Sequence, residues 1–126
     1  MDMLLWVVAV VAAASFLLAG SLKLALPHAR LTADPKMGWA RDFSASQVKL
    51  IGLLEVLGAI GLVLPPWVGI AEGLVPLAAA GLCLDMVGAF STHVRRGDPI
   101  ASRVPPLVLG ALMFVLAVGR YWVEPF

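Results

Sequence analysis

Long apolar stretches alternate with short polar segments along this chain. The apolar stretches cover residues 3–26, 45–64, 70–91 and 104–122. Each is long enough to cross the hydrocarbon core of a bilayer as an α-helix. We therefore predict an all-α fold, an integral membrane bundle of four transmembrane helices that forms one domain over residues 1–126.

Capping and turn residues mark where these helices begin and end. Ser44, followed by Gln47 at the third helical position, forms a capping box that predicts the start of the second helix. That helix is expected to stop at residue 64, before a proline pair that begins with Pro65. Pro76 leaves two interpretations of the third helix open. The helix is either kinked there, or it starts later, near Gly73.

Composition places the chain in the membrane class. Hydrophobic residues make up 61% and charged residues 13%, and the mean hydropathy is +0.97. Soluble domains carry about twice that share of charge. The single cysteine excludes an intramolecular disulfide and a dithiol relay, and the two histidines lie too far apart to suggest a metal site. Because no catalytic, metal-binding or nucleotide-binding motif is present, we do not expect a self-contained enzyme or a nucleic-acid partner.

The basic residues gather on one side of the four-helix arrangement. Of the nine lysines and arginines, only Arg120 falls on the other side. The positive-inside rule then predicts a multi-pass protein of the plasma membrane, with the 27–43 loop in the cytoplasm and both termini outside. The other eight basic residues are Lys23, Arg30, Lys36, Arg41, Lys49, Arg95, Arg96 and Arg103.

Glu55 is a carboxylate well inside an otherwise apolar helix. A charge at that depth costs roughly 2.5–3.5 kcal/mol on insertion scales. Small residues share its helix face, so its side chain is predicted to face the bundle. Lys23 and Asp85 lie on small-residue faces of other helices, and His93 follows Asp85 by two turns. We predict that these four residues form one buried polar cluster.

The cluster has more acids than lysines. Lys23 either extends to the membrane interface or pairs with one of the acids. The second acid then needs His93, a water molecule or a proton, because two neighbouring carboxylates disfavour each other's charge. The cluster is therefore a candidate site for a ligand or a proton. Arg120 is a separate polar residue on the outer side, and we expect it to extend outward or to pair with Glu124.

Several segments of the chain resemble the DoxX-like family of small four-helix membrane proteins. They are AGSLKL (19–24), GLLEVLGAIGLVLP (52–65), GAFSTHVRRGD (88–98) and PPLVLGALMFVLAVGR (105–120). The resemblance covers nearly the whole chain and implies a four-helix transmembrane fold. It points to Lys23, Glu55, His93 and Arg120 as polar positions of the family pattern. Asp85 is not carried over from the family.

The sequence leaves three functions open. The favoured one is an accessory or scaffold subunit of a membrane complex, with the 27–43 loop or the helix faces as its docking surface. An oligomer of this chain is also compatible with the sequence. The second is a redox component that binds a quinone or lipid and uses Glu55 and His93 as proton carriers. The resemblance bears on both, because some relatives look like subunits of thiosulfate:quinone oxidoreductases and others act with redox-defence enzymes. The third is a small proton-coupled transporter, although the one-sided charge argues against a dual-topology exporter.

Overall fold

The computed structural model describes residues 1–126 apart from the side chain of Lys36. The described residues form helices and no strand, and four of the helices are long and apolar enough to cross a membrane. The prediction of an all-α membrane protein is therefore confirmed. The long helices are α1 (Asp2–Ala25), α3 (Ala45–Val68), α4 (Leu74–Arg96) and α5 (Ile100–Val118), which continues as one π-helical turn, η2 (Gly119–Val123).

The start of α3 follows its sequence signal, but its end does not. The Ser44 side chain accepts a hydrogen bond from the Gln47 backbone, and the Gln47 side chain accepts one from the Ser44 backbone. The helix then runs through the proline pair to Val68, four residues beyond the predicted end. The fixed φ of proline is helical, and the pair lies in the last turn, so the backbone hydrogen bonds that it removes are lost only near the end of the helix. Termination falls instead at Gly69, which takes the left-handed conformation that glycine adopts without a steric cost.

The start of α4 resolves the alternative that Pro76 left open. The helix begins at Leu74, with Gly73 as its N-cap residue. Pro76 therefore lies in the first turn, where its missing N–H group would have no intrahelical partner in any case. The later start is the observed one, and the helix continues past Pro76 to Arg96.

The segment 27–43, predicted as a loop, contains two short helices. These are α2 (His28–Ala33) and η1 (Pro35–Asp42). They pack on a small core of their own, centred on buried Leu31, Ala40 and Val48. The Nε2 atom of His28, at the start of α2, lies 3.0 Å from the Ala40 carbonyl oxygen of η1. The loop prediction is corrected because α2 folds back onto η1, which the local sequence does not reveal.

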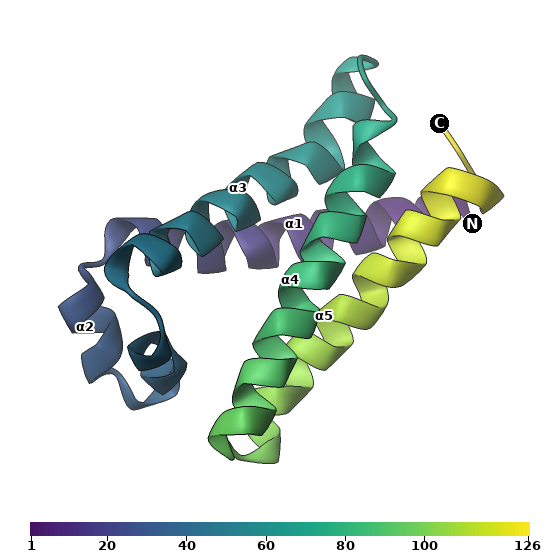
Figure 1. Ribbon diagram of the computed structural model, residues 1–126. Coiled ribbons are helices and arrows are strands. Elements are labelled where there is room, and N and C mark those ends of the chain that lie inside the picture. Colours follow the sequence, from purple (N-terminus) through teal and green to yellow (C-terminus); the bar gives the residue numbers. More distant parts are fainter.

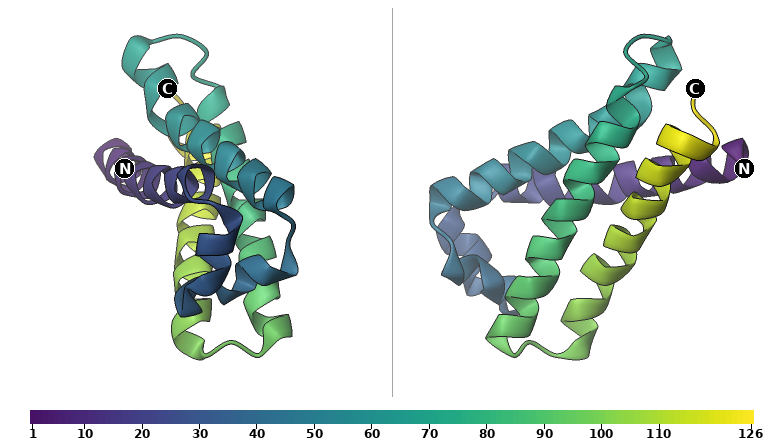
Figure 2. Two further views of the ribbon diagram at one scale, coloured as in Figure 1. Left: turned by 90° about the vertical axis from the view of Figure 1, so that its left-hand side faces the viewer. Right: turned by 45° about the vertical axis from the view of Figure 1, so that its right-hand side comes forward.

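The long helices form two antiparallel pairs, α1 with α3 and α4 with α5 (Figure 1). The pairs meet at the end of the molecule where both termini lie, which we call the terminal end. They spread apart toward the opposite end, where α2 and η1 occupy the space beside α4 (Figure 2). We call this the basic end, because it carries the arginine-rich 27–43 and 95–103 segments.

Apolar side chains fill the region where the pairs meet. Large side chains buried there include Leu5 and Phe16 from α1, Leu62 from α3 and Met113 from α5. Many other leucines and valines of the four long helices remain exposed on the outside of the molecule. Such a surface requires an apolar surrounding, so the outer faces of the helices contact bilayer lipid.

Arg120 corrects the prediction made for it. Its side chain is buried and donates to Asp2 Oδ1 over 2.6 Å and to the Glu124 backbone carbonyl over 3.0 Å. The guanidinium also lies 3.8 Å from the centre of the Phe126 ring. It therefore neither extends outward nor pairs with the Glu124 carboxylate, because the start of α1 lies beside η2. This ion pair joins the two termini.

Candidate functional site

The site begins with a close approach of α1 and α3. A Cβ atom at Gly20 would lie 2.6 Å from the Gly52 carbonyl oxygen, and one at Gly52 would lie 2.8 Å from the Gly20 carbonyl oxygen. Only glycine permits backbones to approach so closely. The approach brings Lys23, one turn from Gly20, against Glu55, one turn from Gly52. Lys23 Nζ lies 2.5 Å from Glu55 Oε1, and both residues are buried.

Lys49 gives this helix pair a second polar contact, which the sequence reasoning missed. Its ammonium group donates to the carbonyl oxygens of Lys23, Leu24 and Leu26 at 3.0, 2.7 and 2.7 Å. These carbonyls end α1 and have no partners within their own helix. A positive charge is also favoured at a helix C-terminus. Lys49 therefore fixes the end of the helix that carries Lys23.

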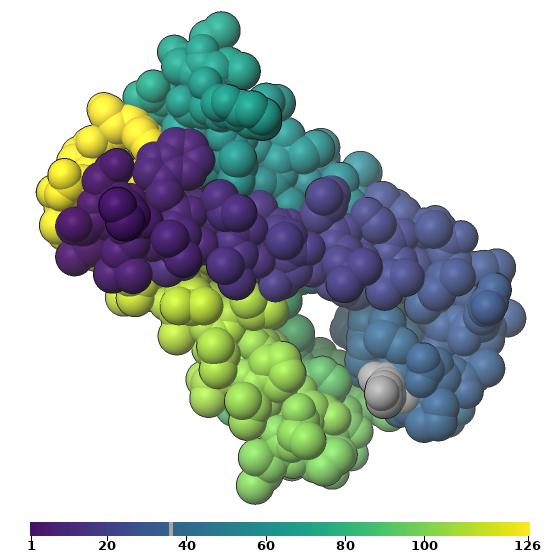
Figure 3. Space-filling view, turned by 180° about the vertical axis from the view of Figure 1, so that it is seen from behind, coloured from purple at the N-terminus to yellow at the C-terminus, as the bar shows by residue number. Residues whose placement is uncertain are grey.

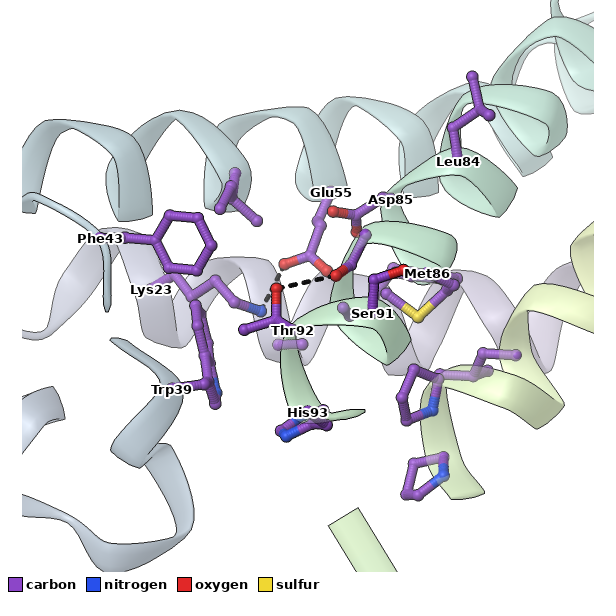
Figure 4. Close-up of a pocket in the computed structure, with 18 of the residues that line it drawn as sticks. Lys23, Trp39, Phe43, Glu55, Leu84, Asp85, Met86, Ser91, Thr92 and His93 are labelled. Atoms are coloured by element: carbon purple, nitrogen blue, oxygen red, sulfur yellow. Dashed lines mark hydrogen bonds and ion pairs between the residues drawn. The ribbon is translucent and has the colours of Figure 1, made fainter. Parts of the chain in front are cut away.

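Asp85 enters the site from α4, beside Glu55 (Figure 4). Its Oδ2 atom is buried and has no hydrogen-bond partner among the described residues. Lys23 is bonded to Glu55 instead. The acid that the sequence left without a lysine is thus Asp85, and one of its oxygens is free to accept a hydrogen bond.

His93 does not supply that bond. Its Nδ1 atom lies 2.7 Å from Asp98 Oδ2, in the turn between α4 and α5. This hydrogen bond, with the nearby charge of Arg96, lowers the pKa of the Asp98 carboxyl. Arg96 also donates to Asp42 Oδ1 over 2.8 Å and so ties the end of α4 to η1. The predicted cluster therefore divides, since three members meet directly and His93 pairs elsewhere.

A cavity of about 500 Å³ lies between the helix pairs on the basic side of the acids. We call it the head cavity. Seen from behind, the surface is hollowed between α1, the 27–43 segment and α5 (Figure 3). All four residues of the predicted cluster contribute to its lining, His93 from its rim. Its volume falls in the range of sites for small organic ligands.

Aromatic side chains form part of the wall of the head cavity. Phe16 comes from α1, Trp39 from η1, and Phe43 from the residue that follows η1. Trp39 stacks edge-on against Phe43, with ring centroids 5.9 Å apart. Lys23 Nζ lies 5.5 Å from the Trp39 ring centre, within reach of a cation–π interaction. The 27–43 segment thus closes one side of a membrane cavity.

The model of the DoxX-like family matches residues 7–116 of the chain. The chain belongs to the DoxX-like family. The matched region includes Lys23, Glu55, Asp85 and His93, whereas Arg120 lies beyond it. No curated protein and no solved structure matches the chain.

In this DoxX-like protein the head cavity combines a cation, a spare acceptor and aromatic walls. Two of the three Lys23 ammonium hydrogens remain for a partner after the bond to Glu55. Asp85 Oδ2 can accept one hydrogen bond. Within the described residues, no group of three or more His, Cys, Asp or Glu side chains is placed to hold a metal ion. The arrangement suits recognition of an organic molecule that has both apolar and polar parts.

Proposed function

We propose that this DoxX-like membrane protein binds a hydrophobic molecule with a polar, quinone-like head in the head cavity. The observation that carries the proposal is the meeting of aromatic walls with Lys23 and the unpartnered Asp85 oxygen in one cavity. Ligand sites of this size are mostly apolar and contain a few convergent polar groups. A compact ring with oxygen atoms at its edge fits that description.

The polar groups match both oxidation states of a quinone. A quinone carbonyl accepts a hydrogen bond, which the Lys23 ammonium can donate. A quinol hydroxyl donates one, which Asp85 Oδ2 can accept. Asp85 therefore takes the proton-carrying role in this proposal, rather than Glu55, which Lys23 holds. The head cavity runs from this acid toward His93, which is hydrogen-bonded to Asp98 at the basic end.

The same proposal makes the protein an accessory subunit of a redox complex. The sequence carries no motif for a redox cofactor, so electrons for a bound quinone must come from a partner protein. The 27–43 segment is the proposed contact, since its outer surface exposes Arg30 and Arg41 while Trp39 faces the cavity. Basic residues at one end support an orientation with that end in the cytoplasm of a plasma membrane. The Lys36 side chain lies outside the described part.

The test is binding of a tailless benzoquinone to the purified protein in nanodiscs, measured by calorimetry. Asp85→Asn preserves the shape of the side chain and leaves the Lys23–Glu55 ion pair intact. We expect it to weaken binding about tenfold, as for loss of one hydrogen bond. Glu72→Gln is the matched control, because it makes the same chemical change at a residue that lines neither cavity. Wild-type affinity in Asp85→Asn, or no binding at all, would contradict the proposal.

A further inference from the structure

A second cavity, of about 550 Å³, lies between α3 and α4 and is open to the membrane on its outer side, where most leucines of its lining are exposed. We call it the tail cavity. Glycines and aliphatic side chains line it, among them Leu57, Leu74 and Leu77. The only ionisable side chains in its lining are Glu55 and Asp85, which also line the head cavity. Apart from these two carboxyl groups, its side chains offer no hydrogen-bonding partner to a polar ligand.

The two cavities lie end to end along α4. The tail cavity is lined by residues from Leu74 to Asp85, a length of about 16 Å at the rise of an α-helix. The head cavity is lined by residues from Leu84 to Arg95. Glu55, Leu84 and Asp85 belong to both linings and form the junction. One cavity therefore extends from the acids toward the basic end, and the other toward the terminal end.

We infer that the tail cavity holds a hydrocarbon tail of the molecule whose head occupies the head cavity. The ligand class is then a long-chain amphiphile rather than a compact hydrophobic molecule. This inference rests on the proposed function and adds the tail to it. Its basis is that the two cavities adjoin at three shared lining residues, together with the aliphatic lining beyond them.

An acyl chain of a bilayer lipid is the competing occupant of the tail cavity. It would meet the same aliphatic side chains, but it would have no reason to end at the two carboxyl groups. A tail attached to a bound head starts at that junction and is held there by the head. The two occupants differ in one measurable respect, since only the attached tail makes ligand affinity depend on the tail cavity.

Two glycines of α4 provide a matched pair of variants. Gly81 lines the tail cavity and Gly88 lines the head cavity, one on each side of Asp85. A Cβ atom built at either position meets no other described atom within 4 Å. The first side-chain atom of a leucine therefore meets no clash at either position, and leucine also raises helix propensity. Gly81→Leu and Gly88→Leu thus each fill one cavity and leave the helix intact.

The probes are a tailless benzoquinone and the same ring with a decyl tail, both measured in nanodiscs by calorimetry. The measured quantity is the ratio of their two dissociation constants. Partitioning of the tail into lipid is the same for every variant and cancels when these ratios are compared. We expect Gly81→Leu to reduce the advantage of the decyl probe about fivefold, through lost packing of the tail. Gly88→Leu is expected to weaken both probes and keep the wild-type ratio.

The outcomes separate this inference from the function on which it rests. If the tailless ring binds and the ratio in Gly81→Leu equals that of the wild type, the tail lies elsewhere. The inference is then wrong and the proposed function stands. If neither probe binds the wild type, the proposed function is refuted, and this inference with it. Melting temperatures of both leucine variants, expected at or above the wild-type value, show that the comparison concerns folded protein.

Discussion

The two helix pairs contain similar residues and use them in opposite ways. In the α1–α3 pair, Gly20 and Gly52 face each other at contact distance, and the buried acid has a lysine partner. In the α4–α5 pair, Gly81 faces open space, and the acid of that pair, Asp85, keeps one oxygen without a partner among the described residues. Both pairs contribute to the walls of the cavities, but the acid of the first pair is paired with a lysine and the acid of the second is not.

The difference shows that the structural role of a glycine or an acid in a membrane helix depends on what the residue faces. A glycine opposite a backbone allows close packing, and a glycine opposite a cavity only leaves room for a ligand. An acid opposite a lysine strengthens helix association, and an acid without one is available for binding. Substitutions of the same type in the two pairs should therefore have different effects, and the following predictions run from the largest to the smallest.

Breaking the ion pair should have the largest effect on stability. Glu55→Gln leaves the buried Lys23 ammonium without an opposite charge, which typically costs about 3–5 kcal/mol. Reversible unfolding in mixed micelles measures the loss. Asp85→Asn, the corresponding change in the other pair, removes no ion pair from the described structure and should cost far less.

A double variant tests whether the loss comes from the unpaired charge. Lys23→Met combined with Glu55→Leu removes both charges and keeps similar volumes, so most of the stability should return. If the double variant is as unstable as Glu55→Gln alone, packing at this position matters more than charge. The claim that charge pairing distinguishes the α1–α3 pair from the α4–α5 pair would then be wrong.

The glycines give an intermediate effect that should change sign between the pairs. In Gly52→Ala the new Cβ atom lies 2.8 Å from both the Gly20 carbonyl oxygen and the Lys23 Cβ atom. Such overpacking costs about 1–3 kcal/mol. In Gly81→Ala the Cβ atom meets nothing, and the better helix former should stabilise α4 by roughly 0.5–1 kcal/mol. Equal destabilisation of the two variants in the same unfolding assay would contradict the conclusion that Gly52 is closely packed and Gly81 is not.

The smallest effect is expected at the turn that joins α4 to α5. The hydrogen bond with His93 and the charge of Arg96 lower the pKa of Asp98 in the folded protein. A lowered pKa contributes stability that is complete above the unfolded value of about 3.9 and is lost as pH falls through the lower folded value. The wild type should therefore lose stability below about pH 4. Asp98→Asn should show a flatter profile, and an identical profile would contradict this assignment.

Much of the fold follows from local features of the sequence. The spans follow from the length and apolarity of their segments, and α3 starts where Ser44 and Gln47 predict. The Lys23–Glu55 pair follows from the cost of a charge in lipid and from the small residues on both helix faces. These features depend on neighbouring residues, or on a single strong energetic requirement, and are therefore readable from sequence.

Contacts between distant segments were not readable in this way. Trp39 enters the head cavity because η1 folds back beside α4, and Arg120 pairs with Asp2, 118 positions away. His93 turns to Asp98 because the turn after α4 brings an acid closer to it than Asp85. An isolated tryptophan in a basic loop was the one available signal for the first of these contacts.

The sequence by itself determined that the chain enters a membrane as four helices, that its basic residues gather at one end, and that one acid exceeds the lysines available to it. These properties follow from the transfer of each segment from water to lipid. Only the tertiary structure decided which acid is left over and where the cavities lie. Lipid and a packed helix face are equally apolar, so hydropathy does not distinguish a face that packs from one that borders a cavity.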